Sequence, residues 1–182
     1  MSFTPEPDTP LAGYYAQTQP RTGAVLSRRS LGTLDAVTIG RYATTIGATD
    51  PVHYDPAAAR SAGYADVVAP PNLLAAIVEW GIGTPETRLQ PDGTPDDGDT
   101  PLGDGDLGLR VMGAGEEMDL VNPVTAGTEV VLETTLDAVT PKKTRAGTCV
   151  FVTTLNTFMS ADGAVLNRNR RTVVLRNPVE ES

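Results

Sequence analysis

Hydrophobic and polar positions along this chain indicate a helical first half followed by a β-rich second half. Apolar residues recur at helical spacing between Thr38 and Gly47, the residues that we expect to cap and to end a first short helix. Asp55 as an N-cap, Pro56 at the first helical position and Gly63 at the end predict a second short helix.

The run from Asn72 to Trp80 is the most apolar part of the first half. It follows Pro70-Pro71 and ends before Gly81, and these bounds fit a helix. Its side chains leave little polar face. The run therefore predicts a helix that is buried nearly all round and forms the spine of the domain.

After residue 108 the pattern changes to runs rich in Val, Leu, Thr and Phe, which favour β-strands. The predicted strands are an early one at 23–31 and four long ones at 108–121, 128–139, 148–160 and 164–176. Asp162-Gly163 predicts a hairpin turn between the last two. These elements predict an α+β domain in which a curved antiparallel sheet wraps around one buried helix. Such a sheet has an edge strand that needs a partner, so we expect a dimer.

The chain is expected to contain one domain with irregular flanking segments. We predict an extended N-terminal arm at 1–22, a single domain at 23–177 and a tail at 178–182. An acidic insertion rich in Gly and Pro interrupts the domain at 84–108. Residues 86–106 of this insertion carry a charge of −6, out of −9 for the whole chain. The acidity is therefore local, and it argues against a nucleic-acid partner, which would need clustered Lys and Arg.

Composition excludes further classes of protein. No run is long enough to span a membrane, and the start lacks the basic and apolar parts of a signal peptide. The single cysteine, Cys149, cannot form an intramolecular disulfide, which fits a reducing cytoplasm. The aspartates of the insertion do not follow the order of a calcium-binding EF-hand loop. We predict a cytoplasmic protein with no metal site and no cofactor.

Chemistry is expected around His53, the one histidine of the chain. The unperturbed pKa of histidine lies near working pH, so histidine is the usual proton carrier of an active site. Asp50 and Asp55 flank His53, and Pro51 restricts the loop between them. Two interpretations stay open: a histidine that faces a pocket, and one that orders its loop through a hydrogen bond to a neighbouring aspartate.

The spacing of residues around His53 resembles that of the MaoC-like hydratase/dehydratase family. The residues that carry the resemblance are Tyr42, Ala43, Gly47, Pro51, His53, Asp55 and Gly63. The continuation through residues 63–71 resembles the FAS1-like dehydratase branch of that family. The resemblance runs from about residue 23 to residue 176 and implies a hot-dog fold.

This resemblance implies (R)-specific addition of water to a trans-2-enoyl thioester, or the reverse reaction, on a CoA or carrier-protein substrate. In the family, a carboxylate and a histidine activate one water, and a backbone N–H at the start of the buried helix polarises the thioester carbonyl. This chain departs from the pattern at both places. Ala48 stands where the carboxylate is expected, and the proline pair Pro70-Pro71, which has no N–H, stands at the start of the helix.

We predict His53 and Asp50 as the catalytic residues, with Asp50 as the substitute for the missing carboxylate. The alternative role of Asp50 is to cap the turn before Pro51. Asp55 is expected to serve as a helix cap.

Four further residues are candidates for substrate binding, each with an alternative. Tyr42 and Tyr64 line an acyl pocket or belong to the core. Asn72 caps the buried helix or donates to the thioester carbonyl. Arg170 lies on the last strand with two other arginines, which form a solvent-facing edge or contact the phosphates of the ligand.

Two functions follow from these residues, beside a third possibility, a stand-alone thioester-binding or scaffold protein without turnover. The first is a hydro-lyase, an enoyl-thioester hydratase or 3-hydroxyacyl-thioester dehydratase, in a homodimer or in a heterodimer with a MaoC-type chain. The second is a non-catalytic subunit that binds the acyl thioester while such a partner supplies the chemistry. Ala48 favours the second function, whereas His53 and Asp50 favour the first.

Overall fold

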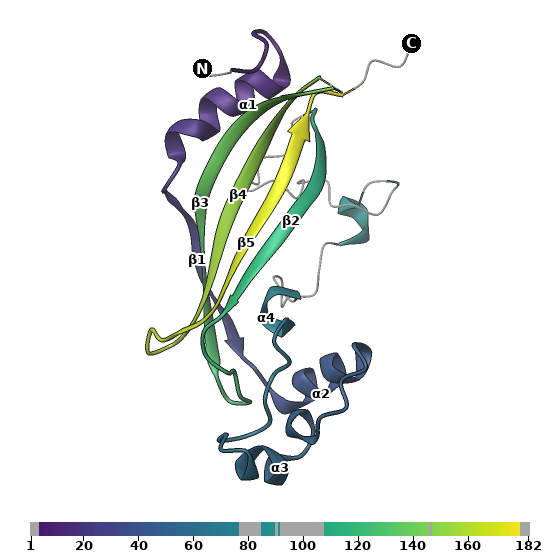
Figure 1. The fold of residues 1–182 in the computed structure, drawn as a ribbon, viewed down its shortest axis with the longest axis vertical. Coiled ribbons are helices and arrows are strands. Elements are labelled where there is room, and N and C mark those ends of the chain that lie inside the picture. The colour runs from purple at the N-terminus through teal and green to yellow at the C-terminus, as the bar shows by residue number, and fades with distance from the viewer. Residues whose placement is uncertain (1–3, 77–84, 90, 92–107, 146, 179–182) are drawn as a thin grey trace.

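One curved antiparallel sheet forms the body of the molecule (Figure 1). The computed structural model describes residues 4–76, 85–89, 91, 108–145 and 147–178. The strands are β1 (Val25–Thr33), β2 (Arg110–Leu120), β3 (Glu129–Thr144), β4 (Gly147–Ser160) and β5 (Val165–Arg176). They are hydrogen-bonded in the order β1-β3-β4-β5-β2, and each neighbouring pair is antiparallel.

Short helices lie at both ends of this sheet. They are α1 (Pro10–Thr18), α2 (Ala36–Thr45), α3 (Pro56–Ser61) and α4 (Leu73–Ala76), with 3-10 turns at Gln19–Arg21, Pro51–His53 and Glu86–Arg88. α2 and α3 lie together beyond one end of the sheet, and α1 lies at the opposite end (Figure 1). Within the residues that the structure describes, no helix is long and apolar enough to cross a membrane.

All five predicted strands are present, and the largest difference from the prediction is in β3. This strand continues to Thr144, although the sequence predicts a turn that begins at Pro141. β1 pairs with β3 only between Glu129 and Thr135, so beyond that point β3 is an edge strand on that side. Proline is tolerated on an edge, where no neighbour requires its missing N–H.

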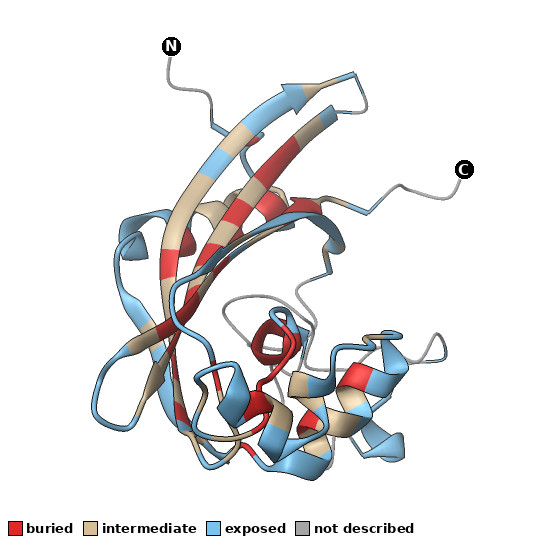
Figure 2. Cartoon of the chain, turned by 60° about the horizontal axis from the view of Figure 1, so that its bottom comes forward, coloured by how far each residue is buried: buried red, intermediate tan, exposed pale blue. Residues whose placement is uncertain are grey.

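The core consists of two apolar clusters on the same face of the sheet. Buried residues occupy every second position of β4 from Val150 to Phe158, which places them on one face. The first cluster joins Phe158 and Leu132 to Leu73 and Leu74 of α4. The members of the second are Leu11, Tyr14, Leu136, Val150, Val152, Val173 and Leu175. Figure 2 shows the buried positions in red along the strands and on α4.

α4 confirms that the apolar run after the proline pair begins a buried helix. Leu73 and Leu74 are at most 1% exposed. The helix predicted for 72–80 is described only as far as Ala76, and its remainder lies outside the described residues. Most of the insertion at 84–108 also lies outside them.

Residues 10–18 of the N-terminal arm form α1, so the expectation of an extended arm is wrong there. Thr9 caps the helix by accepting a hydrogen bond from the N–H of Ala12. Pro10 stands at the start of the helix, where its missing N–H leaves no bond unmade. Leu11 and Tyr14, at most 5% exposed, pack into the second cluster. The arm is therefore part of the packed structure.

The helices α2 and α3, which flank the loop that contains His53, each begin at an aspartate that caps the helix. The residue that caps α2 is Asp35 and not Thr38. The Asp35 carboxylate accepts hydrogen bonds from Thr38 N at 2.9 Å and from Thr38 Oγ1 at 2.8 Å. These bonds hold the pKa of Asp35 below its usual value. Gly47, with φ of +71°, follows the end of α2 as predicted. Asp55 caps α3, also as predicted, by accepting from Ala57 N at 2.8 Å.

Replacing Asp55 by alanine is expected to lower the free energy of unfolding by about 1 kcal/mol, because the N–H of Ala57 loses its acceptor. In thermal melts the variant should unfold about 2–4 °C below the wild type. Asp55→Asn keeps an acceptor oxygen and is the matched control, with a melting temperature near that of the wild type. An alanine variant that melts with the wild type would show that this cap contributes nothing.

Candidate functional site

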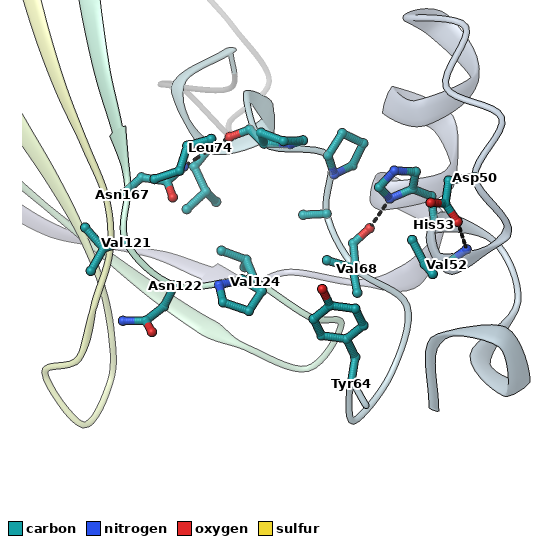
Figure 3. A pocket seen from close by; sticks show the side chains of 15 residues that line it. Asp50, Val52, His53, Tyr64, Val68, Leu74, Val121, Asn122, Val124 and Asn167 are labelled. Atoms are coloured by element: carbon teal, nitrogen blue, oxygen red, sulfur yellow. Dashed lines mark hydrogen bonds between the residues drawn. The ribbon is translucent and has the colours of Figure 1, made fainter. Parts of the chain in front are cut away.

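A cavity of about 370 Å³ opens between the His53 loop and the sheet (Figure 3). Its walls come from the loop before α3, the segment that leads to α4, the connection between β2 and β3, and β5. Asp50 and His53 lie at one side of the cavity, and Asn167 and Val121 lie at the other. The structure therefore brings the histidine that the sequence singles out into a cavity with a carboxylate.

Among the described residues, the ring of His53 forms one hydrogen bond, to the backbone. Its Nδ1 lies 2.6 Å from the carbonyl oxygen of Val68 (Figure 3). A carbonyl oxygen can only accept, so Nδ1 carries the proton in this bond. In the neutral ring, Nε2 is then the acceptor. This arrangement fixes the tautomer that a general base requires.

The carbonyl that holds His53 belongs to a well-anchored segment. Val68 N donates to Val52 O at 2.9 Å, which ties the segment to the His53 loop. On its other side, Ala69 N donates to Val124 O at 2.7 Å, and Val68 forms an isolated bridge with Thr125. The ring of His53 is therefore positioned relative to both walls of the cavity.

Asp50 caps the short turn that contains His53. Its Oδ1 accepts from Val52 N at 3.0 Å, so the capping role predicted as an alternative is present. Asp50 also lines the cavity. Among the described residues, no hydrogen bond or ion pair joins its carboxylate to the ring of His53. The second carboxylate oxygen is free of these contacts.

Ala48 does not line the cavity, although the resemblance places the catalytic carboxylate at this position. Its carbonyl oxygen accepts a hydrogen bond of 2.6 Å from the hydroxyl of Tyr54, and its N–H donates to Ala43 O at 2.9 Å. The Tyr54 ring also stands edge-on to His53, with 6.4 Å between the ring centroids. The loop keeps its shape through backbone contacts at Ala48.

The proline pair forms the wall where α4 begins. Pro70 and Pro71 both line the cavity. Pro70 O accepts from Leu73 N at 3.0 Å, which starts the helix. Pro71 O accepts from Nδ2 of Asn167 at 3.2 Å, which links the start of α4 to β5.

The structure separates the predicted substrate-binding residues. Tyr64 lines the cavity, whereas Tyr42 packs against the first apolar cluster. Asn72 is exposed and is not among the residues that line the cavity. Its side chain forms no hydrogen bond within the described part of the chain, so the cap expected at Asn72 is not made.

Arg170 faces solvent as expected, on the sheet face opposite the cavity, but its expected place at an edge of the sheet is wrong. β5 is an interior strand between β4 and β2. Arg168 and Arg170 alternate along it with Asn167, which lines the cavity, and they point to the opposite face. Arg170 pairs with Asp137 at 3.0 Å and Arg168 pairs with Asp119 at 3.3 Å.

The prediction from sequence misses the polar residues at the β5 side of the cavity. Asn167 is buried there, and Asn122 lines the cavity while its Nδ2 donates to Val165 O at 2.7 Å. A signal for Asn167 exists in the alternation Asn-Arg-Asn-Arg from residue 167 to residue 170. In a strand this alternation sends the asparagines to one face and the arginines to the other.

The family described as "FAS1-like, dehydratase domain region" matches residues 23–168. The chain belongs to this family. A relative from Clavibacter michiganensis, named "UPF0336 protein", is 31% identical over 141 residues, which are 76% of this chain and 81% of the relative. The name of that relative states no activity.

Solved structures confirm the hot-dog fold. A MaoC-like dehydratase from Rhodospirillum rubrum is 27% identical, with a TM-score of 0.59 over 87% of this chain and 94% of the other. A chain of the ChsH1-ChsH2 complex from Mycobacterium tuberculosis has a TM-score of 0.68 at 20% identity, over 94% of this chain and 98% of that one. The predicted α+β class and curved antiparallel sheet are confirmed with the fold.

Proposed function

We propose that this chain is an (R)-specific enoyl-thioester hydratase, or a 3-hydroxyacyl-thioester dehydratase in the reverse direction, that acts on a CoA or carrier-protein substrate. The observation that carries the proposal is the hydrogen bond from His53 Nδ1 to Val68 O. It leaves Nε2 as an acceptor in a cavity that also contains the Asp50 carboxylate. Membership of a dehydratase family supports the reaction class.

In the hydration direction, Nε2 of His53 removes a proton from a water molecule that the Asp50 carboxylate orients. The oxygen of this water bonds to C3 of the enoyl group, and the electrons of the C2–C3 double bond move to the thioester as an enolate. The protonated His53 then gives its proton to C2, which restores the neutral ring. Dehydration is the same sequence in reverse.

The thioester carbonyl needs a hydrogen-bond donor, because its oxygen gains negative charge in the enolate. Pro70 and Pro71 have no N–H to supply. The next backbone N–H belongs to Asn72, and it has no acceptor among the described residues. Asn72 follows Pro71 of the cavity wall but does not itself line the cavity, so we propose that its backbone N–H, and not its side-chain amide, reaches the carbonyl when substrate is bound.

Part of the cavity wall consists of apolar side chains that are exposed to solvent, and this exposure supports a dimer. β2 is an edge strand, and Leu120 at its end and Val121 beyond it line the cavity while they are 52% and 41% exposed. A partner on this edge would bury both side chains and narrow the opening. We propose a homodimer or a heterodimer with a MaoC-type chain. The ChsH1-ChsH2 complex, which shares the fold, is formed by two different proteins and supports the heterodimer.

The proposal is tested by incubating the purified chain with crotonyl-CoA and following the loss of the enoyl absorbance. We expect saturable hydration that depends on the concentration of the chain. A chain that binds crotonyl-CoA in calorimetry without hydrating it would contradict the proposed activity and would support a binding subunit.

Ala48 is the observation that favours this second candidate, a non-catalytic subunit that binds acyl thioesters beside a catalytic MaoC-type partner. The position where the resemblance places the carboxylate has only a methyl group. In this case the partner supplies both the carboxylate and the base, and His53 orders the loop.

Replacing Ala48 by aspartate separates the two candidates. If Asp50 is the working carboxylate, a second carboxylate adds little, and the rate of crotonyl-CoA hydration should change by less than about fivefold. Ala48→Asn, which has the same size without the charge, is the matched control. A gain of about 100-fold in the aspartate variant alone, the size of a general base contribution, would contradict the role of Asp50 and favour the second candidate.

A further inference from the structure

Three asparagines form a row on the sheet face that carries the cavity. Asn167 and Asn169 are two residues apart on β5, so their side chains share a face. Asn156 on β4 stands directly opposite Asn169, with Cβ atoms about 5 Å apart. Asn167 lines the cavity. Asn167 is therefore the member of the asparagine row (Asn156, Asn167, Asn169) that lines the described cavity, and Asn169 and Asn156 lie beyond it on the same face.

The amides of the row are buried but not fully hydrogen-bonded. All three residues are at most 6% exposed. Asn156 Oδ1 accepts from Thr134 Oγ1 at 2.8 Å, and Asn167 Nδ2 donates to Pro71 O at 3.2 Å. Asn169 Oδ1 is buried without a partner, and Asn167 Oδ1 has none among the described residues. Among the described residues, the row thus has one fully buried oxygen without a donor, Asn169 Oδ1, and one oxygen without a donor at the cavity wall, Asn167 Oδ1.

Such oxygens are unfavourable in the core of a sheet unless a ligand satisfies them. A buried amide oxygen without a donor loses the hydrogen bonds that it makes in water, and an apolar side chain at the same position would avoid this loss. The neighbours in the first apolar cluster, such as Phe158, show that this face accepts apolar side chains. The hydrogen bond to Pro71 O accounts for the amide nitrogen of Asn167 but gives its oxygen no partner.

The missing partner is a hydrogen-bond donor. A hydrocarbon chain offers no donor, and a ketone or ester carbonyl can only accept. A hydroxyl group can donate to one oxygen of the row and accept from an amide N–H of another. His53 marks the side of the cavity where the proposed reaction takes place, and Asn167 lies at the opposite side (Figure 3).

We propose that Asn167 Oδ1, at the cavity end of the asparagine row, accepts a hydrogen bond from a hydroxyl group carried by the acyl chain several carbons beyond the thioester. The substrate class is then a hydroxylated acyl thioester and not a plain fatty acyl thioester. This inference rests on the proposed function, because it takes the ligand of the cavity to be an acyl thioester. The amide N–H groups of the pantetheine arm are the other possible donors, and they are present whether or not the acyl chain is hydroxylated.

The test compares the binding of saturated acyl-pantetheine thioesters, which cannot be hydrated, by calorimetry. The ligands have six, eight and ten carbons, each with and without a terminal hydroxyl group. For at least one chain length, we expect the full-length chain to bind the hydroxylated ligand about tenfold more tightly, as expected for one hydrogen bond to a buried group. Equal affinities at all three lengths would overturn the inference.

Two variants locate the contact. Asn167→Leu should reduce the tenfold preference to less than about twofold, because it removes the oxygen at the cavity wall; it also loses the hydrogen bond to Pro71 O. Thr172→Val, on the opposite face, loses the hydrogen bond to Thr153 Oγ1 and should keep the preference. A preference that survives in Asn167→Leu would overturn the assignment to Asn167. So would an equal loss of affinity for both ligands, which would indicate a contact with the pantetheine arm.

The outcome is independent of turnover. A chain that prefers hydroxylated ligands but does not hydrate crotonyl-CoA would uphold this inference and contradict the proposed activity. A chain that hydrates crotonyl-CoA but shows no preference for hydroxylated ligands would contradict this inference and uphold the proposed activity. A wild-type chain that binds none of the six ligands would contradict both.

Discussion

Replacing His53 by alanine is expected to reduce the rate of crotonyl-CoA hydration by about 100- to 10,000-fold, the range of a general acid–base contribution. Nε2 of His53 is the acceptor that faces the cavity, because Nδ1 donates to Val68 O. Without the ring, the described cavity keeps no imidazole, and the Asp50 carboxylate alone would have to orient the water and take its proton. Steady-state kinetics on the purified variant measures the loss in kcat.

His53→Asn is the matched variant for this experiment. The amide Nδ2 of asparagine is placed like Nδ1 of histidine, so it can still donate to Val68 O and keep the loop ordered, but nothing replaces Nε2. We expect the asparagine variant to melt near the wild type and to be as inactive as the alanine variant. Substantial activity in His53→Asn would show that His53 only orders the loop.

The second large effect is expected at Asp50, where the capping role and the catalytic role of the carboxylate can be tested separately. Asn and Asp are comparable as N-caps, so Asp50→Asn should keep the hydrogen bond to Val52 N and the melting temperature. It removes the negative charge that orients the water, and kcat should fall by about 100-fold. Asp50→Ala should lose both activity and about 1 kcal/mol of stability.

Asp55→Asn is the control for this change, because Asp55 is also an N-cap, at the start of α3, but does not line the cavity. Its activity should equal that of the wild type. If Asp50→Asn retains wild-type activity as well, Asp50 is a structural cap and the carboxylate of the reaction must come from elsewhere.

Local signals were sufficient for much of the fold. Asp55, Pro56 and the glycine at position 63 bound a helix because capping and positive φ are properties of a few adjacent residues. The prediction was wrong where tertiary context decides. α1 forms because Leu11 and Tyr14 find an apolar cluster made by distant strands. β3 passes through Pro141 because β1 has already ended.

At the site, too, the residues fixed by local signals could be predicted, whereas those placed by tertiary context could not. His53 and Asp50 were predicted from a contiguous motif, and both line the cavity. Arg170 was placed on an edge because a single sequence does not give the order of strands, and β5 is in fact interior. The opposite wall, with Asn167, comes from a strand more than 100 residues along the chain. Its contact with Pro71 O depends on the packing of α4 against the sheet.

Above all, we propose that this chain carries out its own chemistry, with His53 and Asp50, despite Ala48. The most direct measurement is hydration of crotonyl-CoA by the chain produced and purified without any related chain, with chiral analysis of the product. We predict (R)-3-hydroxybutyryl-CoA, formed at a rate that falls about 100-fold in Asp50→Asn. No product, or the (S)-isomer, would contradict the account.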